Sequence, residues 1–344
     1  MNLKSFPPAV DFAVPEIFRA VIAASNALAR LDEIAEVLDN SAVFINTIPV
    51  LEAQASSEIE NVVTTHDSIF MADVSSSKVD TETLLAIRLR KAITVGSDVA
   101  ATRGISFKLA SMICSEMLGR EMKLRQSPGT VIQSGGKTIY TPPAPGELKE
   151  LLASWEKFVN REDVLHPLIV MALSHYQFEA IHPFSDGNGR TGRVLNVLHL
   201  VASGLLKQPV IQMSQYLFEH RDEYYKRLRD VDSQDAWIPW VLFMLEGVRV
   251  SAVESASKLK QITTMQLSFG ERYDTKASLI ALIFEKPYVQ IGQVVERCGV
   301  TRVTAANWLE SLERQGALTS MVSGREKFFI NQELISALRS SSAS

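Results

Sequence analysis

The chain has 344 residues and a formal net charge of -4, and 46% of its residues are hydrophobic while 22% are charged. This composition excludes a disordered chain, and the length predicts two or three domains. The small negative charge gives no general attraction to nucleic acid or to an anionic membrane. The two cysteines, Cys114 and Cys298, lie outside any cysteine–histidine cluster, so a disulfide framework and a zinc site are disfavoured.

The first hundred residues have helical spacing and almost no strand pattern, so residues 1–100 are predicted to form a helical N-terminal region. The N-terminus lacks an apolar stretch of signal-peptide length. The longest apolar run near the middle, residues 238–245, is too short to span a bilayer and predicts a buried helix. We therefore expect a cytoplasmic protein that does not enter a membrane.

The first strand signal lies at residues 130–140. Two short β-prone arms, 130–133 and 138–140, flank a Gly-Gly turn, which predicts a hairpin. The proline-rich run 141–146 ends this hairpin, because proline cannot continue a strand ladder.

Two buried helices are predicted on either side of a glycine-rich loop. The first runs from about His166 to Ile181, with Pro167 in a first-turn position that tolerates proline. The second begins near Gly189 and continues through an apolar face. The order is therefore helix, loop of the anion-binding type, helix.

The loop itself, residues 182–193, reads HPFSDGNGRTGR. Its glycines are Gly187, Gly189 and Gly192. Glycines let the backbone approach a ligand closely, and the free amides and dipole of a helix start form a phosphate site. Arg190 and Arg193 are three residues apart, so both project from one face and can fork onto phosphate oxygens.

Two further side chains complete the chemistry of this loop. Asp186 is a hard oxygen ligand suited to Mg²⁺ that bridges two phosphates. His182, at the end of the preceding helix, is the one base nearby. A plain turn with solvated arginines is the alternative, but a chance match at any start is on the order of 10⁻¹⁰. The residues indicate a nucleotide-dependent transferase.

The run 182–193 matches the Fic family signature, H-x-F-x-[D/E]-G-N-G-R-x-x-R, without a departure. The chain thus resembles the Fic proteins, most of which move AMP from ATP to a protein hydroxyl group. The resemblance implies that His182 is the base for a Ser, Thr or Tyr hydroxyl and that Asp186 holds Mg²⁺. Phe184 would anchor the loop in the core.

The same resemblance assigns the phosphate contacts of ATP. Asn188 would contact the α-phosphate, together with the amides of Gly187 and Gly189. Arg190 and Arg193 would bind the β- and γ-phosphates.

The hairpin at 130–140 gains a role from the resemblance as well. In Fic proteins a flap at this place pairs with an extended segment of the target protein as an added strand. A target protein is therefore expected to dock on 130–140, with a plain connecting hairpin as the alternative. Self-modification is a common readout in the family, and a homodimer is also left open.

Residues 56–61, SSEIEN, fit a second family pattern, [S/T]-x-x-x-E-[G/N], which lies on an inhibitory helix in the family. The resemblance implies that Glu60 pairs with Arg193 and occupies the fork meant for the γ-phosphate, while Ser56 helps to fix it. A solvated surface helix is the alternative. In some Fic proteins the matching glutamate aligns a water that removes AMP, so the direction of the reaction is left open.

Residues 270–335 have the order of a winged helix-turn-helix, three helices and then a hairpin. Gly299 is predicted to end the second helix and Thr301 to cap the third. The third helix carries two arginines, Arg302 and Arg314, against two glutamates. Because phosphate contacts usually need clustered positive charge, this neutral helix disfavours DNA binding without excluding it. A role in protein contacts, dimerisation or target choice is expected.

The predicted fold is mainly α. It has a Fic-type helical core at 101–255 with a β-hairpin flap, the N-terminal region 1–100 with the inhibitory helix, and a winged helix at 270–335. The predicted function is Mg²⁺- and ATP-dependent protein adenylylation restrained by Glu60. The alternatives are removal of AMP, another donor or transferred group, and a non-catalytic regulator that senses ATP and binds DNA. An intact His182 argues against the last, since a sensor needs no base.

Overall fold

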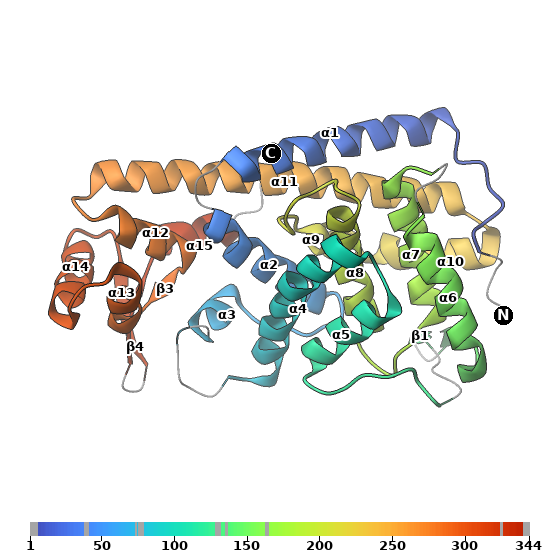
Figure 1. Cartoon of the computed structure of the whole chain (residues 1–344), viewed down its shortest axis with the longest axis horizontal. Coiled ribbons are helices and arrows are strands. Elements are labelled where there is room, and N and C mark those ends of the chain that lie inside the picture. The colour runs from blue at the N-terminus through green and yellow to red at the C-terminus, as the bar shows by residue number, and fades with distance from the viewer. Residues whose placement is uncertain are drawn as a thin grey trace.

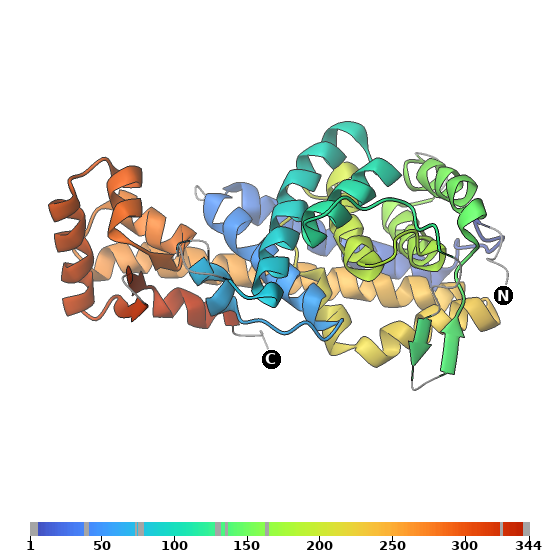
Figure 2. The ribbon, with the colours of Figure 1, turned by 90° about the horizontal axis from the view of Figure 1, so that it is seen from below.

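The computed structural model describes residues 6–37, 41–72, 74, 79–127, 132–134, 137–161, 165–323 and 326–339. Helices make up most of this part of the chain, which confirms the predicted mainly α class. Two long helices, α1 (Pro15–Val37) and α11 (Trp237–Arg272), pack side by side along the long axis of the molecule (Figures 1 and 2). The predicted buried helix at 238–245 is the first part of α11.

Five central helices form one group: α4 (Thr81–Arg103), α5 (Phe107–Leu118), α6 (Leu148–Val159), α7 (Pro167–Ile181) and α8 (Asn188–Ala202). Helix α7 of this group packs against α11. Helix α8 packs against α4, α5 and α7, and all of its residues from 190 to 201 are buried. Because neighbouring helices cover the sides of α8, only its two ends are open to other groups. Its N-terminal end carries the glycine-rich loop.

Four further helices complete the core: α2 (Ser41–Glu58), α3 (His66–Ala72), α9 (Met213–Glu219) and α10 (Arg221–Gln234). Helix α2 packs on α4 and α9 and reaches α8. Its buried side chains include Phe44, Ile48 and Leu51, so α2 is part of the core and not a solvated surface helix.

The predicted hairpin is present. Strands β1 (Ile132–Ser134) and β2 (Lys137–Tyr140) are antiparallel, with Ser134 opposite Lys137, and a short 3-10 helix η1 (Pro145–Glu147) follows. The Gly-Gly turn and residues 130–131 lie outside the described residues. The hairpin projects from the half of the molecule opposite the C-terminal helices (Figure 2).

The C-terminal part has the predicted three helices and hairpin. Its elements are α12 (Ala277–Glu285), β3 (Tyr288–Val289), α13 (Ile291–Cys298), α14 (Arg302–Arg314), β4 (Thr319–Ser323), β5 (Glu326–Ile330) and α15 (Gln332–Arg339). Gly299 is left-handed with φ 66°, and Thr301 caps α14, as predicted. Strand β3 and helix α15 were not predicted. The strands form one antiparallel sheet in the order β3-β5-β4.

The predicted domain boundaries stay predictions. Helix α4 runs through residues 100 and 101, and α11 runs through residues 255 and 270, so the backbone does not break at either place. None of the helices in the described ranges combines the length and apolar character needed to cross a membrane.

Candidate active site

The loop between α7 and α8 turns sharply at both ends. His182 closes α7 in a left-handed conformation, φ 50° and ψ 60°, and Gly187 precedes α8 with φ 78°. A side chain at Gly187 would meet Met117, because a Cβ there would lie 2.6 Å from its Cε. Between the two ends Phe184 is fully buried and stacks on Phe107, with ring centroids 5.6 Å apart. The loop is therefore fixed by the packing of Phe184 as well as by the left-handed conformations of His182 and Gly187.

Asn188 holds the loop from inside. The Phe184 amide donates to its Oδ1 at 2.8 Å, and its Nδ2 donates to the Phe184 carbonyl at 2.9 Å. Because both side-chain groups are used and Asn188 is 2% exposed, this side chain shapes the loop. The α-phosphate contact that the resemblance implied for Asn188 stays a prediction.

The start of α8 has unused donors. The first bond within the helix runs from the Thr191 amide to the Gly187 carbonyl at 3.0 Å. The amides of Asn188, Gly189 and Arg190 therefore have no acceptor within the helix, and they point along the positive end of its dipole. Such a helix start is a site for an anion.

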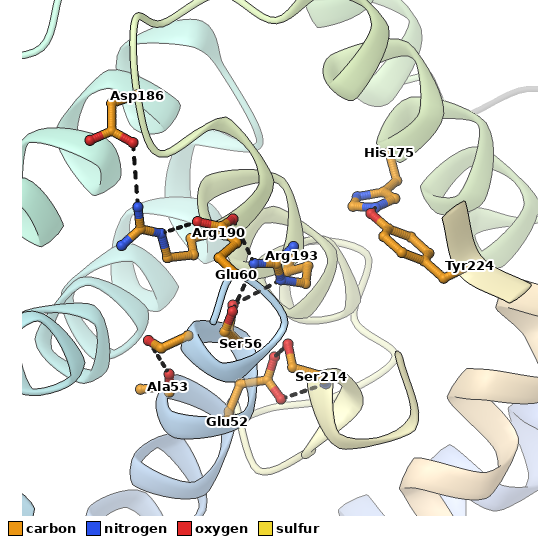
Figure 3. A network of polar contacts seen from close by, with 11 residues as sticks. Glu52, Ala53, Ser56, Glu60, His175, Asp186, Arg190, Arg193, Ser214 and Tyr224 are labelled. Atoms are coloured by element: carbon orange, nitrogen blue, oxygen red, sulfur yellow. Dashed lines mark hydrogen bonds and ion pairs between the residues drawn. The ribbon is translucent and has the colours of Figure 1, made fainter. Parts of the chain in front are cut away.

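Two buried arginines lie beside these amides, and a carboxylate already holds both (Figure 3). Glu60 Oε2 is 2.7 Å from Arg190 Nε, and Glu60 Oε1 is 2.9 Å from Arg193 Nη2. Arg190 is 5% and Arg193 2% exposed. At Gly189 a Cβ would lie 2.7 Å from Glu60 Oε1, so the absence of a side chain lets the carboxylate reach the helix start.

The segment that carries Glu60 differs from expectation in two respects. Helix α2 ends at Glu58, and Glu60 lies in the following turn, where its amide donates to the Ser57 carbonyl at 3.0 Å. Ser56 contacts Arg193 and not Glu60: Arg193 Nε donates to Ser56 Oγ at 3.0 Å and Nη2 to the Ser56 carbonyl at 2.8 Å. Glu60 is thus presented by a turn, because the helix has already ended.

Burial and facing charges act together on Arg193. Burial alone would lower its pKa, but the facing Glu60, together with Tyr224, Tyr225 and Glu179, raises it above the ordinary value. The guanidinium is therefore always charged, and a buried charge of this kind needs an anion beside it.

His182 is neutral at physiological pH. Burial lowers its pKa to about 4, well below the ordinary value for a histidine. A neutral imidazole can accept a proton, so the ring is in the state that a general base requires.

Asp186 is exposed, as is its neighbour Ser185 in the loop. Half of its side chain faces solvent, and its Oδ1 is 3.4 Å from Arg190 Nη2. Among the described residues no group of three His, Cys, Asp or Glu side chains could hold a metal ion. Mg²⁺ is commonly bound by one or two carboxylates together with substrate phosphates, and a single carboxylate beside an anion site fits that mode.

Two carboxylates near the site, the buried Glu52 and the half-buried Glu179, were not predicted. Glu52 accepts hydrogen bonds from the Ser214 amide at 2.8 Å and from its Oγ at 2.5 Å, which ties α2 to α9 (Figure 3). Burial raises the pKa of Glu52 to about 7, and it has the same effect on Glu179 of α7. Glu52 lies one turn before Ser56, but its partner is 162 residues away and gave no signal.

Arg125 was missed as well. It is 4% exposed and lies in the segment between α5 and the hairpin. Its Nε donates to the His182 carbonyl at 2.8 Å. Hydrogen bonds to backbone carbonyls do not depend on the identity of the accepting residue, so no sequence pattern could have indicated this contact.

Three family models match successive parts of the chain. The Fic/DOC family N-terminal model matches residues 18–98, and the Fic/DOC family model matches residues 104–200. A model described as the C-terminal domain of SoFic-like protein adenylyltransferase matches residues 273–334. The middle match contains the whole loop described above.

Similar proteins agree with this assignment. The protein adenylyltransferase Fic of Culex quinquefasciatus is 38% identical over 119 residues, 34% of this chain, and that of Drosophila melanogaster is 38% identical over 109 residues, 31% of this chain. The matched parts span only 22% and 21% of those two relatives.

Solved structures share the fold. A Fic family protein from Desulfovibrio desulfuricans superposes with a TM-score of 0.60 at 21% identity, covering 94% of this chain and 98% of that one. Fic-1 from C. elegans gives a TM-score of 0.54 at 21% identity over 72% of this chain and 74% of its own. With three family domains in succession and this shared fold, the chain belongs to the Fic family.

Proposed function

We propose that this chain transfers AMP from ATP to a Ser, Thr or Tyr hydroxyl of a protein, and that Glu60 restrains the transfer. The observation that carries this proposal is the Glu60 carboxylate held between Arg190 and Arg193 at the start of α8. Two buried guanidinium groups and three free amides make a site for a polyphosphate, and an internal carboxylate there competes with it. The names of the curated relatives support AMP as the transferred group.

Several residues of the loop take part in this reaction. Neutral His182 takes the proton of the target hydroxyl. The hydroxyl oxygen bonds to the α-phosphorus of ATP, and the bond between that phosphorus and the pyrophosphate oxygen breaks. Arg190 and Arg193 bind the β- and γ-phosphates and stabilise the leaving pyrophosphate. The amides of the α8 start hold the α-phosphate, with Asn188 keeping the loop in shape. Mg²⁺ held by Asp186 would neutralise phosphate charge.

The restraint follows from the same charges. Removing one partner of a buried ion pair typically costs about 3–5 kcal/mol, because the other charge is left without an anion. ATP must therefore either displace Glu60 from Arg193 or bind with its γ-phosphate elsewhere, which misaligns the α-phosphate. A variant that lacks the carboxylate offers both arginines to ATP.

The test uses wild type, Glu60→Gly and His182→Ala proteins with Mg²⁺, a cell extract as acceptor, and ATP labelled at the α- or γ-phosphate. We expect protein label from the α position only, raised roughly tenfold or more in Glu60→Gly and lost in His182→Ala. Glu58→Gly is the matched control, since Glu58 faces Gln54 and not the arginines, and it should label like wild type.

Other outcomes would redirect the proposal. Label from the γ position would mean phosphorylation in this site. The absence of label from both positions, with release of AMP from a pre-adenylylated protein, would make AMP removal the main activity.

The partners and setting are part of the proposal. A target protein would dock on the hairpin around 132–140 by adding a strand, and the chain itself is a candidate acceptor. We also propose that the protein is cytoplasmic. A homodimer is the assembly that we propose to test, by sedimentation of the purified protein.

A further inference from the structure

Arg125 is a buried cation to which the proposed chemistry assigns no task. Its Nε donates to the His182 carbonyl at 2.8 Å, and its Nη2 donates to the carbonyls of Ile181 at 3.4 Å and of Pro143. The Arg125 amide donates to the Pro183 carbonyl at 3.0 Å. One residue therefore binds three successive carbonyls at the end of α7 and a fourth beyond the hairpin.

These hydrogen bonds satisfy carbonyl groups at the end of α7. The last carbonyls of a helix have no donor within the helix and carry the negative end of its dipole, and a guanidinium offers five donors and a positive charge. His182 is in a left-handed conformation, which residues other than glycine rarely adopt. The bond from Arg125 to its carbonyl fixes this conformation and with it the direction in which the imidazole leaves the backbone.

The hairpin is tied to the same helix end. Tyr140, the last residue of β2, donates from its Oη to the Ala180 carbonyl at 3.0 Å. Three residues later the Pro143 carbonyl accepts from Arg125. The chain that leaves the hairpin is thus attached to the last turn of α7 through Tyr140 and to His182 through Arg125.

We propose that Arg125 is a positioning residue for the transfer: it holds the backbone of His182 and the base of the hairpin in one fixed relation. A hydroxyl presented along the hairpin then meets the imidazole. This inference rests on the proposed function. Arg125 acts at the His182 end of the loop, whereas the phosphate site lies at the α8 end, so its loss should impair transfer and spare ATP binding.

The experiment compares Arg125→Gln, Arg125→Lys and Tyr140→Phe, all in the Glu60→Gly background. AMP incorporation into protein is measured with α-labelled ATP, and ATP binding by calorimetry with Mg²⁺. For Arg125→Gln we expect the maximal rate to fall by about 30-fold or more while the ATP dissociation constant changes less than about threefold. Lys keeps the charge and some donors, so Arg125→Lys should restore part of the rate. Tyr140→Phe, which removes a single bond, should lose about three- to tenfold.

Lys123→Gln is the matched control, because Lys123 lies in the same segment with an exposed side chain that pairs with the exposed Glu121. It should behave like the parent. Thermal unfolding shows whether each variant folds, and Tyr140→Phe carries the test if Arg125→Gln does not. An unchanged rate in the folded variants, or loss of ATP binding in parallel with the rate, would overturn the proposal.

A second readout separates this inference from the proposed function. If the Glu60→Gly parent incorporates no AMP, the proposed function fails, but the role of Arg125 can still be read from the ring titration of His182 by NMR. Burial lowers the pKa of His182 most and the charge of Arg125 lowers it further, while a hydrogen bond with the Glu179 backbone and the charge of Glu60 raise it. Arg125→Gln should therefore raise this pKa, and an unshifted titration would show that Arg125 does not hold His182.

Discussion

Two helix starts in this chain, those of α8 and α14, differ both in local structure and in surroundings. Helix α14 is capped by its own sequence: Thr301 Oγ1 accepts from the Thr304 amide at 3.2 Å. Helix α8 is preceded by Gly187, which has no side chain to cap it. Both carry arginine within the first turns, but Arg302 of α14 is exposed, whereas Arg193 of α8 is 2% exposed.

The difference indicates under which conditions a helix start becomes a binding site. At α14 the Thr301 side chain satisfies the Thr304 amide, and the Arg302 guanidinium is solvated, so no buried charge there requires an anion. At α8 the amides are left open and two cations are buried beside them, so an anion must come from elsewhere. The anion present is Glu60, 133 residues before Arg193 in the sequence.

The largest effect is expected from removing the buried cation. Arg193→Ala, in the Glu60→Gly background, should lower AMP incorporation by about 100-fold or more, because the pyrophosphate loses its main counter-charge. In the wild-type background the same change should lower the free energy of unfolding by about 3–5 kcal/mol, since it breaks a buried ion pair and two bonds to Ser56. Labelling and urea unfolding measure the two effects.

Arg302→Ala at the other helix start is the control for this change. An exposed arginine should alter the free energy of unfolding by no more than about 0.5 kcal/mol. Equal losses of stability at Arg193 and Arg302 would contradict the comparison.

The two helix starts also show how much of the structure could be predicted from the sequence. Both starts were predicted, Thr301 from its capping residue type and the α8 start from its glycines, because such signals are local. The contact between Glu60 and Arg193 came from a family pattern and is present, although its inhibitory role remains a proposal. Glu52 and Arg125 escaped prediction because their partners are distant, and those of Arg125 are backbone carbonyls that leave no trace in the residue types.

A smaller effect is expected at Glu52, the buried carboxylate that ties α2 to α9. Its pKa is raised from 4.5 to about 7 in the folded protein, so between these pH values the folded state binds a proton that the unfolded state has released. The stability that this group contributes is complete below about pH 4.5 and is lost as the pH rises through 7. Glu52→Gln stays neutral throughout, and should match wild type at pH 5 but exceed it at pH 8 by about 1–3 kcal/mol.

Urea unfolding at the two pH values tests this expectation, with Glu58→Gln on the same helix as the control. Glu179, whose pKa is raised in the same direction, is present in every variant and cancels in the difference. A Glu52→Gln protein that follows the wild-type pH dependence would show that Glu52 is charged in the folded state.

The smallest effect is expected at the start of α14, where the alternative of a DNA-binding regulator would have to act. Its exposed residues include Arg302 and the apolar Val303, which is 70% exposed, and the helix as a whole balances its arginines with glutamates. Arg302→Glu should therefore change AMP incorporation less than about twofold, and fluorescence anisotropy should detect no binding of duplex DNA even at low salt. Binding that weakens steeply with salt, that Arg302→Glu abolishes and that survives His182→Ala would instead make this helix start a second anion site, one that depends on exposed charge where α8 depends on buried charge.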